Sequence, residues 1–177
     1  MIIITGLSGS GKSTMGPELA KYLGDQKAYL DEDPSFKQDK PKVKYQGRDV
    51  NLWDAEEAID FDDLSTRTLL KVANHQRVVL TGFYFPPSFL QTLPVEKIIV
   101  LDISPEISIA RRQKSKSLSS PAKGFDLDKD RWMVENYTYP FFKKGLENLE
   151  NSFHGLVYHI DATQEPFVVW KELLGLI

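Results

Sequence analysis

Short apolar runs alternate along this chain with longer stretches in which apolar residues recur at helical spacing. The apolar runs lie at residues 1–5, 27–30, 78–81, 97–102 and 156–160, and the helical stretches at 14–23, 58–74, 105 onward, 131–150 and 165–174. Runs without a polar face are typical of parallel strands, which helices cover on both sides. The pattern therefore predicts a three-layer α/β fold, with a five-stranded parallel sheet flanked by helices.

Two segments do not fit this alternation. Residues 34–51 are polar and rich in lysine, and they predict a loop or a small subdomain. Residues 115–123 are mostly small and polar and predict an insertion after a helix.

Pro17 lies inside the first helical stretch, where it removes a backbone hydrogen bond and is expected to bend the helix. We see no internal repeat, so residues 1–177 are expected to form a single domain.

Composition narrows the function classes. The chain has 177 residues, a net charge of −3 and no cysteine, which disfavours a generic nucleic-acid binder and excludes disulfides and thiolate metal sites. Its apolar runs are shorter than the ~18 residues of a spanning helix or the apolar core of a signal peptide. We expect a cytoplasmic monomer or homodimer with a small-molecule partner and neither nucleic acid nor membrane as partner.

The first apolar run leads into the sequence G-x-x-x-x-G-K-S, and a helical stretch follows it. This strand–loop–helix context is typical of a P-loop, whose glycines let successive peptide N–H groups converge on a phosphate. A glycine turn that only joins strand and helix is the alternative, and the complete motif disfavours it. We expect ATP to be bound by Gly6, Leu7, Ser8, Gly9, Ser10, Gly11, Lys12, Ser13 and Thr14. Lys12 would reach the outer phosphates, and the Ser13 hydroxyl would bind Mg²⁺.

Three acids, Asp31, Glu32 and Asp33, follow the second apolar run. Ligands of open parallel sheets bind beyond the carboxyl ends of the strands, so this position is informative. Alternating geometry would turn Asp31 and Asp33 to one side, toward the P-loop. A kinase needs one carboxylate to activate the attacking hydroxyl and another near Mg²⁺, and we assign these roles to Asp33 and Asp31. A solvated acidic loop is the alternative interpretation.

Trp53 and Asp54 precede the second helical stretch. An indole face beside a carboxylate suits a ring-bearing polyol, because the ring stacks and the acid accepts from two hydroxyls. Asp54 could equally be no more than a helix N-cap, and the residues alone leave both interpretations open.

Arg111 and Arg112 lie in the helical stretch that follows the fourth apolar run, just before the small polar insertion. Negative charge builds on the equatorial oxygens during phosphoryl transfer, and cations near a closing lid would stabilise it. We therefore include both arginines with Asp33 and Lys12 as candidate catalytic residues, although the pattern does not indicate which arginine acts. A solvated helix face is the alternative.

The chain resembles the uridine kinase and nicotinamide riboside kinase branch of the P-loop nucleoside kinases over nearly its whole length. The more specific segments are 33–37 (DPSFK), 53–58 (WDAEEA), 81–83 (TGF) and 139–144 (YPFFKK). The resemblance implies a P-loop NTPase fold of the nucleoside and nucleotide kinase type, with a lid at about 113–128. It also implies that Asp33 is the base, that Phe36 belongs to the substrate site, and that Trp53 and Asp54 hold the ribose and its ring.

Departures from that family leave the acceptor open. Thr81 stands where the family has an acid, so indirect magnesium binding there would be weaker or would use Asp31 instead, and Pro34 replaces a polar residue beside the base. We therefore predict an ATP- and Mg²⁺-dependent kinase for a hydroxyl of a nucleoside-like molecule. One alternative is a kinase for a small polyol or sugar acid, as in shikimate and gluconate kinases. Another is a non-catalytic nucleotide-binding switch, which the missing acid at Thr81 would suit.

Overall fold

The computed structural model describes residues 1–119 and 126–177, with the backbone alone described for residues 116–119. Its main sheet has five parallel strands in the order β2-β5-β1-β6-β7. Their bounds are β1 Ile2–Thr5, β2 Tyr29–Asp31, β5 Val79–Gly82, β6 Lys97–Asp102 and β7 Val157–Asp161. The five-stranded parallel sheet predicted from the apolar runs is confirmed.

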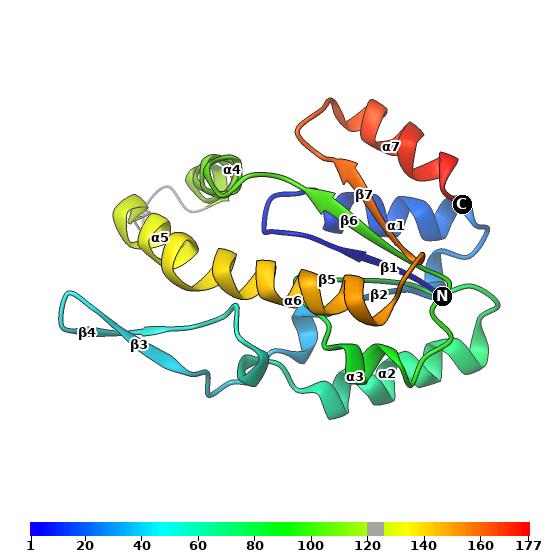
Figure 1. Cartoon of the computed structure of the whole chain (residues 1–177), viewed down its shortest axis with the longest axis horizontal. Coiled ribbons are helices and arrows are strands. Elements are labelled where there is room, and N and C mark those ends of the chain that lie inside the picture. The colour runs from blue at the N-terminus through cyan, green and yellow to red at the C-terminus, as the bar shows by residue number, and fades with distance from the viewer. Residues whose placement is uncertain (120–125) are drawn as a thin grey trace.

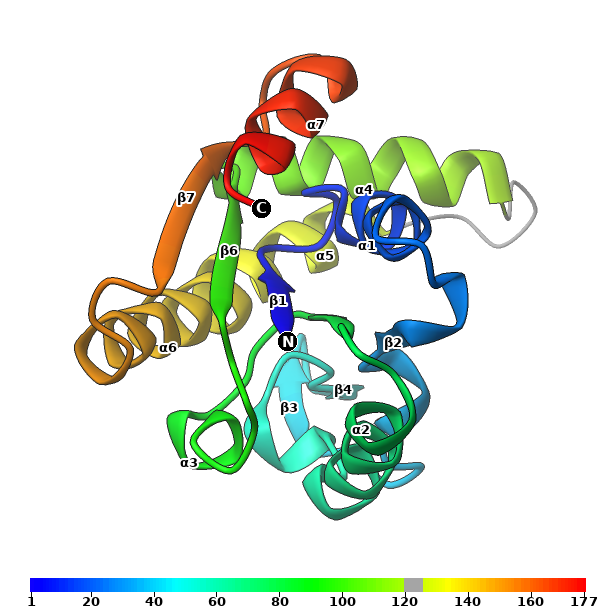
Figure 2. The ribbon, with the colours of Figure 1, turned by 90° about the vertical axis from the view of Figure 1, so that its right-hand side faces the viewer.

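Helices cover both faces of this sheet, and side chains alternate between the two cores. Ile2 and Ile4 of β1 pack in one apolar cluster, while Ile3 packs in the other. Figure 2 shows α1 (Lys12–Tyr22) and α7 (Pro166–Gly175) on one face and α2 (Phe61–Asn74) and α3 (Pro87–Leu90) on the other. The remaining helices are α4 (Pro105–Ser119), α5 (Leu127–Met133) and α6 (Tyr139–Ser152).

Several elements differ in detail from the sequence prediction. The polar segment 34–51 contains an antiparallel hairpin, β3 (Lys42–Tyr45) and β4 (Arg48–Asn51), which forms a separate two-stranded sheet. The second helical stretch starts at Phe61 instead of residue 58, because Asp60 caps the helix by accepting from the N–H of Asp63. A 3₁₀ turn, η3 (Glu56–Ala58), precedes it, and two further 3₁₀ turns are η1 (Gln26–Ala28) and η2 (Asp33–Ser35).

Two prolines inside the predicted helical stretches are accommodated, Pro17 and Pro140. Pro17 lies within α1, which runs on to Tyr22. Pro140 falls in the first turn of α6, directly after a π-helical segment, Val134–Thr138, that joins α5 to α6. The predicted helix at 131–150 is therefore a continuous succession of α, π and α segments. No helix in the described part of the chain is long and apolar enough to cross a membrane.

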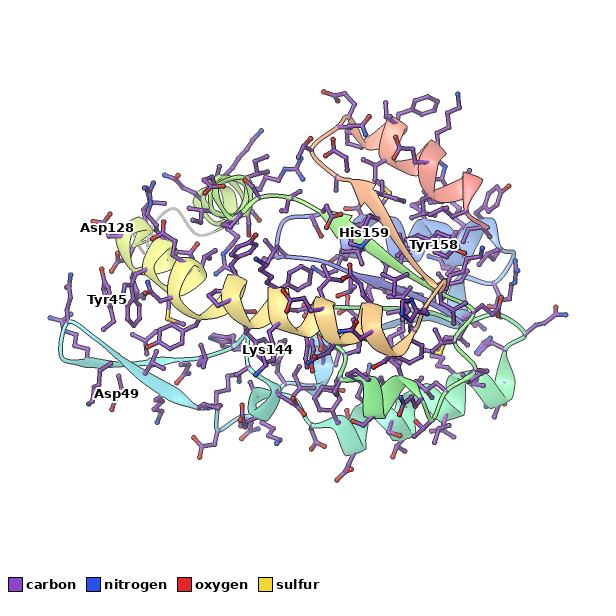
Figure 3. The ribbon with its side chains drawn as sticks, viewed as in Figure 1. Tyr45, Asp49, Asp128, Lys144, Tyr158 and His159 are labelled. Carbon is purple, nitrogen blue, oxygen red and sulfur yellow. The ribbon has the colours of Figure 1, made fainter. Side chains whose placement is uncertain are left out.

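All five strands of the main sheet run in the same direction, so their carboxyl ends meet at one side of the molecule. The hairpin β3–β4 and helices α4 and α5 lie on that side (Figure 1). The hairpin is held there by an aromatic contact, since the rings of Tyr45 and Trp132 are 4.9 Å apart between centroids. In Figure 3 Tyr45 points from the hairpin toward the helix that carries Asp128. Part of the predicted lid at 113–128 lies outside the described residues, and α4 supplies its first residues.

Candidate active site

The loop between β1 and α1 has the backbone of a phosphate-binding turn. Gly9 and Gly11 have φ values of 86° and 104°, in the left-handed region that favours glycine. α1 begins directly at Lys12, so the positive end of its dipole faces the loop. The Lys12 ammonium donates to the carbonyl oxygens of Gly6 (2.7 Å) and Leu7 (3.1 Å), which folds the side chain back along its own loop.

A cavity of about 490 Å³ opens in front of this loop. Most of the predicted site residues line it: Ser8, Gly9, Gly11, Lys12, Ser13, Thr14, Asp31, Asp33, Phe36, Trp53, Asp54 and Arg112. Thr81, Gly82, Phe83 and Ser115 complete its wall. Segments more than a hundred positions apart, such as those of Ser8 and Ser115, thus converge on one space.

Three predicted phosphate-binding residues lie behind the cavity wall. Gly6 and Leu7 are buried and present carbonyl oxygens to Lys12. Ser10 is buried too, and its hydroxyl has no hydrogen-bond partner among the described residues. These positions shape the loop from inside.

Asp31 lies at the end of β2, beside the strand β5 that carries Thr81 in place of an acid. The hydroxyl of Tyr29 donates to Asp31 Oδ2 (2.6 Å) and lies 2.9 Å from Thr81 Oγ1. Asp31 and Thr81 are also partners in the register of β2 and β5. A carboxylate is therefore present beside Thr81, although it comes from the neighbouring strand.

Asp33 follows immediately in η2, and its N–H donates to Asp31 Oδ1 (3.1 Å). Desolvation and the neighbouring Asp31 carboxylate raise the pKa of Asp33 above its usual range, and Lys12 acts in the opposite direction. A carboxylate with a raised pKa is a stronger proton acceptor, which suits a general base.

Trp53 and Asp54 both line the cavity. Helix α2 starts seven residues after Asp54 and uses Asp60 as its N-cap, so Asp54 is not the cap of that helix. The Thr138 hydroxyl donates to Asp54 Oδ2 (2.6 Å). Trp53 is 50% exposed and packs edge-on against Phe36, with ring centroids 5.6 Å apart.

A second cavity of about 760 Å³ adjoins the first and shares Ser8, Asp33, Trp53, Asp54 and Arg112 with it. Its remaining wall comes from the hairpin and from α5: Asp49, Val50, Asn51, Lys129, Asp130 and Met133. The shared residues form a junction between a space at the P-loop and a space under the hairpin. Two such adjoining spaces suit a reaction between two bound molecules.

The two arginines have different surroundings. Arg111 Nη1 donates to the carbonyl oxygen of Gly9 (3.0 Å), so Arg111 holds the P-loop and does not line either cavity. Arg112 lines both cavities, and it donates from Nε and Nη2 to the two carboxylate oxygens of Asp130 (3.0 and 2.5 Å). The geometry therefore separates two arginines that the sequence left equivalent.

Glu32 is a residue that the sequence prediction left without a role. It is fully buried, and its Oε2 accepts from the N–H of Phe83 (2.6 Å). Burial raises the pKa of Glu32 to about 8, against the opposing effects of the Phe83 N–H and the Lys12 charge. Strand alternation contained the signal, because turning Asp31 and Asp33 to one side sends Glu32 to the other. For Thr138 and Asp130 we find no comparable signal in the sequence.

The donor set fits magnesium. The Ser13 hydroxyl and the Asp31 carboxylate line the same cavity and are hard oxygen ligands, the kind that magnesium takes from proteins. Among the described residues no group of three or more histidine, cysteine, aspartate or glutamate side chains could hold a metal ion by itself.

The sequence and the fold match known proteins. The family model described as AAA domain matches residues 2–124. A shikimate kinase from Chlorobaculum tepidum is 37% identical over 82 residues, which cover 46% of this chain and 39% of that kinase. The chain thus spans well under half the length of this curated relative.

Two solved structures have the same fold. A gluconokinase from Sinorhizobium meliloti 1021 matches with a TM-score of 0.57 and 17% identity, over 98% of this chain and 89% of its own. A deoxyadenosine kinase from M. mycoides with bound dATP matches with a TM-score of 0.51 and 17% identity, over 99% and 97%. At this identity the likeness confirms the predicted P-loop kinase fold and leaves the acceptor undecided.

Proposed function

The chain belongs to the AAA domain family, and from that premise we propose that it is an ATP-dependent kinase that phosphorylates a hydroxyl of a nucleoside-like acceptor. The observation that carries this proposal is the junction of the two cavities. Asp33 lines both, together with Trp53, Asp54 and Arg112, while Lys12 and Ser13 line the cavity at the P-loop. That the chain is similar in activity to uridine and nicotinamide riboside kinases is part of this proposal.

The P-loop side binds ATP. Peptide N–H groups of the loop and the start of α1 bind the phosphates, and Lys12, with two of its three N–H donors used on the loop itself, has one left for them. When bound, magnesium would neutralise charge on the phosphates, and Ser13 and Asp31 are the residues that would hold it. Asp31 takes over the place that Thr81 leaves without an acid.

The transfer itself needs a base and a cation. Asp33 accepts the proton of the acceptor hydroxyl as its oxygen bonds to the γ-phosphorus, and the bond to the bridging oxygen breaks to release ADP. Arg112 at the junction faces the charge that develops on the transferred group. Arg111 acts only indirectly, by holding the carbonyl oxygen of Gly9.

The hairpin side suits a ring that carries hydroxyls. Trp53 offers a half-exposed indole, and Phe36 supports it edge-on. Asp54 has one oxygen occupied by Thr138, which leaves the other to accept from a hydroxyl of the acceptor. This combination of an aromatic surface and a fixed carboxylate favours a nucleoside-like molecule.

A kinase for a sugar acid is the second candidate, and the partial match to a shikimate kinase favours it. Against it stands the charge of the second cavity, where the described lining has four acids, Asp33, Asp49, Asp54 and Asp130, and two cations, Arg112 and Lys129. An acidic acceptor would meet repulsion there. A nucleotide-binding switch without an acceptor remains the third candidate, which Thr81 suggests.

ADP release in the presence of Mg·ATP tests these candidates. The acceptors are uridine, nicotinamide riboside, shikimate and gluconate, with a reaction without acceptor as the reference. Stimulation by a nucleoside is the expected result. Stimulation by shikimate or gluconate alone would replace the proposal by the second candidate, and hydrolysis that no acceptor changes would favour the switch.

A further inference from the structure

Arg112 is the cation at the junction of the two cavities, and its side chain is already engaged. Its Nε and Nη2 donate to the two oxygens of Asp130 at 3.0 and 2.5 Å. Both side chains are largely buried, with 18% of Arg112 and 7% of Asp130 exposed. The pair joins α4 to α5, and both of its members line the cavity under the hairpin.

This pairing uses the part of the guanidinium that best matches a carboxylate. Two parallel N–H···O bonds from one edge of an arginine to one carboxylate are the usual way in which proteins recognise an acidic ligand. In this chain Asp130 occupies that edge and compensates its charge. A carboxylate on an incoming acceptor would have to displace Asp130 from Arg112, which would break two charge-assisted hydrogen bonds of a largely buried pair.

The rest of the cavity offers an acidic ligand little else. Among the described residues, the cavity is lined by four carboxylates, of Asp33, Asp49, Asp54 and Asp130, and by two cations, Arg112 and Lys129. Lys44, which lies nearby on the hairpin, forms an ion pair with Asp49 (2.7 Å). The electrostatic balance of the cavity is therefore unfavourable for a negatively charged acceptor.

We propose that Asp130 is a specificity-determining residue, which occupies Arg112 and thereby excludes acceptors that carry a carboxylate or phosphate. Its role is to reject a class of ligand, which is a common route to specificity. The proposal rests on the proposed function, because it takes the cavity under the hairpin as the acceptor site. It also gives a reason why a chain that resembles a shikimate kinase over part of its length would not use that acid.

A matched pair of ligands isolates the charge. Shikimate and its methyl ester have the same ring and hydroxyls, and only shikimate carries a carboxylate. Binding is measured by calorimetry and by thermal shift with a non-hydrolysable ATP analogue present, and turnover by ADP release. The wild-type protein is expected to prefer the ester. Asp130→Asn frees the arginine edge and is expected to move the ratio of the two affinities toward shikimate by about tenfold or more.

Asp128→Asn is the control, because it removes an exposed acid from the same helix and is expected to keep the wild-type ratio. The double variant Arg112→Gln with Asp130→Asn should lose the gain, since the gain depends on the released arginine. If Asp130→Asn does not fold, Asp130→Ser is tested in the same way. A wild-type protein that prefers shikimate, or an Asp130 variant that folds and keeps the wild-type ratio, would overturn the proposal.

The two proposals fail in different ways. A wild-type protein that binds the ester but phosphorylates nothing would count against the kinase assignment, while the affinity ratio still decides the role of Asp130. If neither ligand of the pair binds the wild type or the Asp130 variant, the cavity does not accept ring polyols. The specificity role of Asp130 is then wrong, whether or not the P-loop binds ATP.

Discussion

The Oε2 atom of Glu32, next to the end of β2, accepts a hydrogen bond of 2.6 Å from the N–H of Phe83, the first residue after β5. The carbonyl oxygen of the same Phe83 accepts from the Thr5 hydroxyl at the end of β1 (2.8 Å). Side chains at the ends of two strands thus hold the two peptide groups on either side of Phe83, in the floor of the site. Phe83 lines the cavity, and its ring packs 5.5 Å from that of Phe142 in α6.

The first prediction concerns pH and stability. Glu32 has a pKa of about 8 in the folded chain, against a usual value of 4.5, so the folded state holds a proton that the unfolded state releases. This stabilisation is fully present below about pH 4.5 and is lost as the pH rises through 8. Urea denaturation of the nucleotide-free protein between pH 5 and 9 should therefore show a falling free energy of unfolding.

Glu32→Gln should flatten that dependence, because glutamine keeps an oxygen for the Phe83 N–H and does not titrate. Glu57→Gln, which changes an exposed glutamate outside both cavities, should keep the wild-type slope. An identical slope in the wild type and in Glu32→Gln would show that the buried carboxyl does not have the raised pKa.

The second prediction concerns Gly82. A Cβ atom there would lie 2.4 Å from Cζ of Phe85 and 2.6 Å from Oε2 of Glu32, both of them in fully buried side chains. Gly82→Ala should therefore destabilise the fold by about 1–3 kcal/mol. In a chain of this size that lowers Tm by roughly 2–4 °C per kcal/mol.

Gly175→Ala is the matched control, because a Cβ there has no neighbour within 4 Å in the described structure. Thermal unfolding should separate the two variants clearly. Equal Tm values would mean that Phe85 and Glu32 can move away from an added Cβ atom at little cost in stability. Glu32 would then not be tightly packed against Gly82.

The third prediction concerns the base. Asp33→Asn should lower kcat by about 10²–10⁴-fold, the usual contribution of a general base, while affinity for a non-hydrolysable ATP analogue changes little. Because the pKa of Asp33 is raised, the acid limb of the wild-type pH profile should lie above the usual range of an aspartate. Asp39→Asn, an exposed change in the same segment, should leave kcat intact. Wild-type turnover in Asp33→Asn would remove the base assignment.

The fourth prediction concerns magnesium. Lys12 is surrounded by the acids Glu32, Asp54, Asp33 and Asp31, which favour its charged form although burial lowers its pKa. The phosphates of ATP should therefore bind weakly once EDTA removes the metal, because little positive charge remains to offset these acids. Calorimetry with and without EDTA measures the difference.

Asp31→Asn should raise the magnesium concentration needed for half-maximal nucleotide binding, since it removes the acid beside Thr81. Asp62→Asn changes an acid in the first turn of α2, outside both cavities, and serves as the control. A magnesium requirement that is equal in the wild type and in Asp31→Asn would assign the metal to other ligands.

Much of the fold could be predicted because it depends on local patterns. Apolar runs such as 97–102 have no polar face and must be buried on both sides, which fixes a central strand without knowledge of its neighbours. The hairpin at Lys42–Asn51 escaped prediction because its exposed strands are polar and are held in place by contacts such as that of Tyr45 with Trp132. That contact joins residues far apart in the sequence.

The candidate site likewise has one part that local sequence motifs predict and another part that depends on packing between distant elements. The P-loop and the acids at Asp31 and Asp33 are contiguous motifs, so their grouping at one edge of the sheet follows from strand order and direction. The meeting of Asp54 with Thr138 and of Arg112 with Asp130 depends on how α4, α5 and the π-helical segment pack around the cavities. Sequence alone could not choose between Arg111 and Arg112, because adjacent helical residues differ only in the direction that packing gives them.

The amino-acid sequence by itself determined the parallel sheet, the phosphate-binding loop and the acids that follow β2, since backbone geometry and strand alternation act over a few residues. The tertiary structure alone decided which arginine lines the two cavities and which acid pairs with it. It also decided that Glu32 is buried beneath the site, with its carboxyl bonded to Phe83. Such pairings bring together side chains from separate elements, and only the packing of the whole chain fixes the distances on which hydrogen bonds and charge compensation depend.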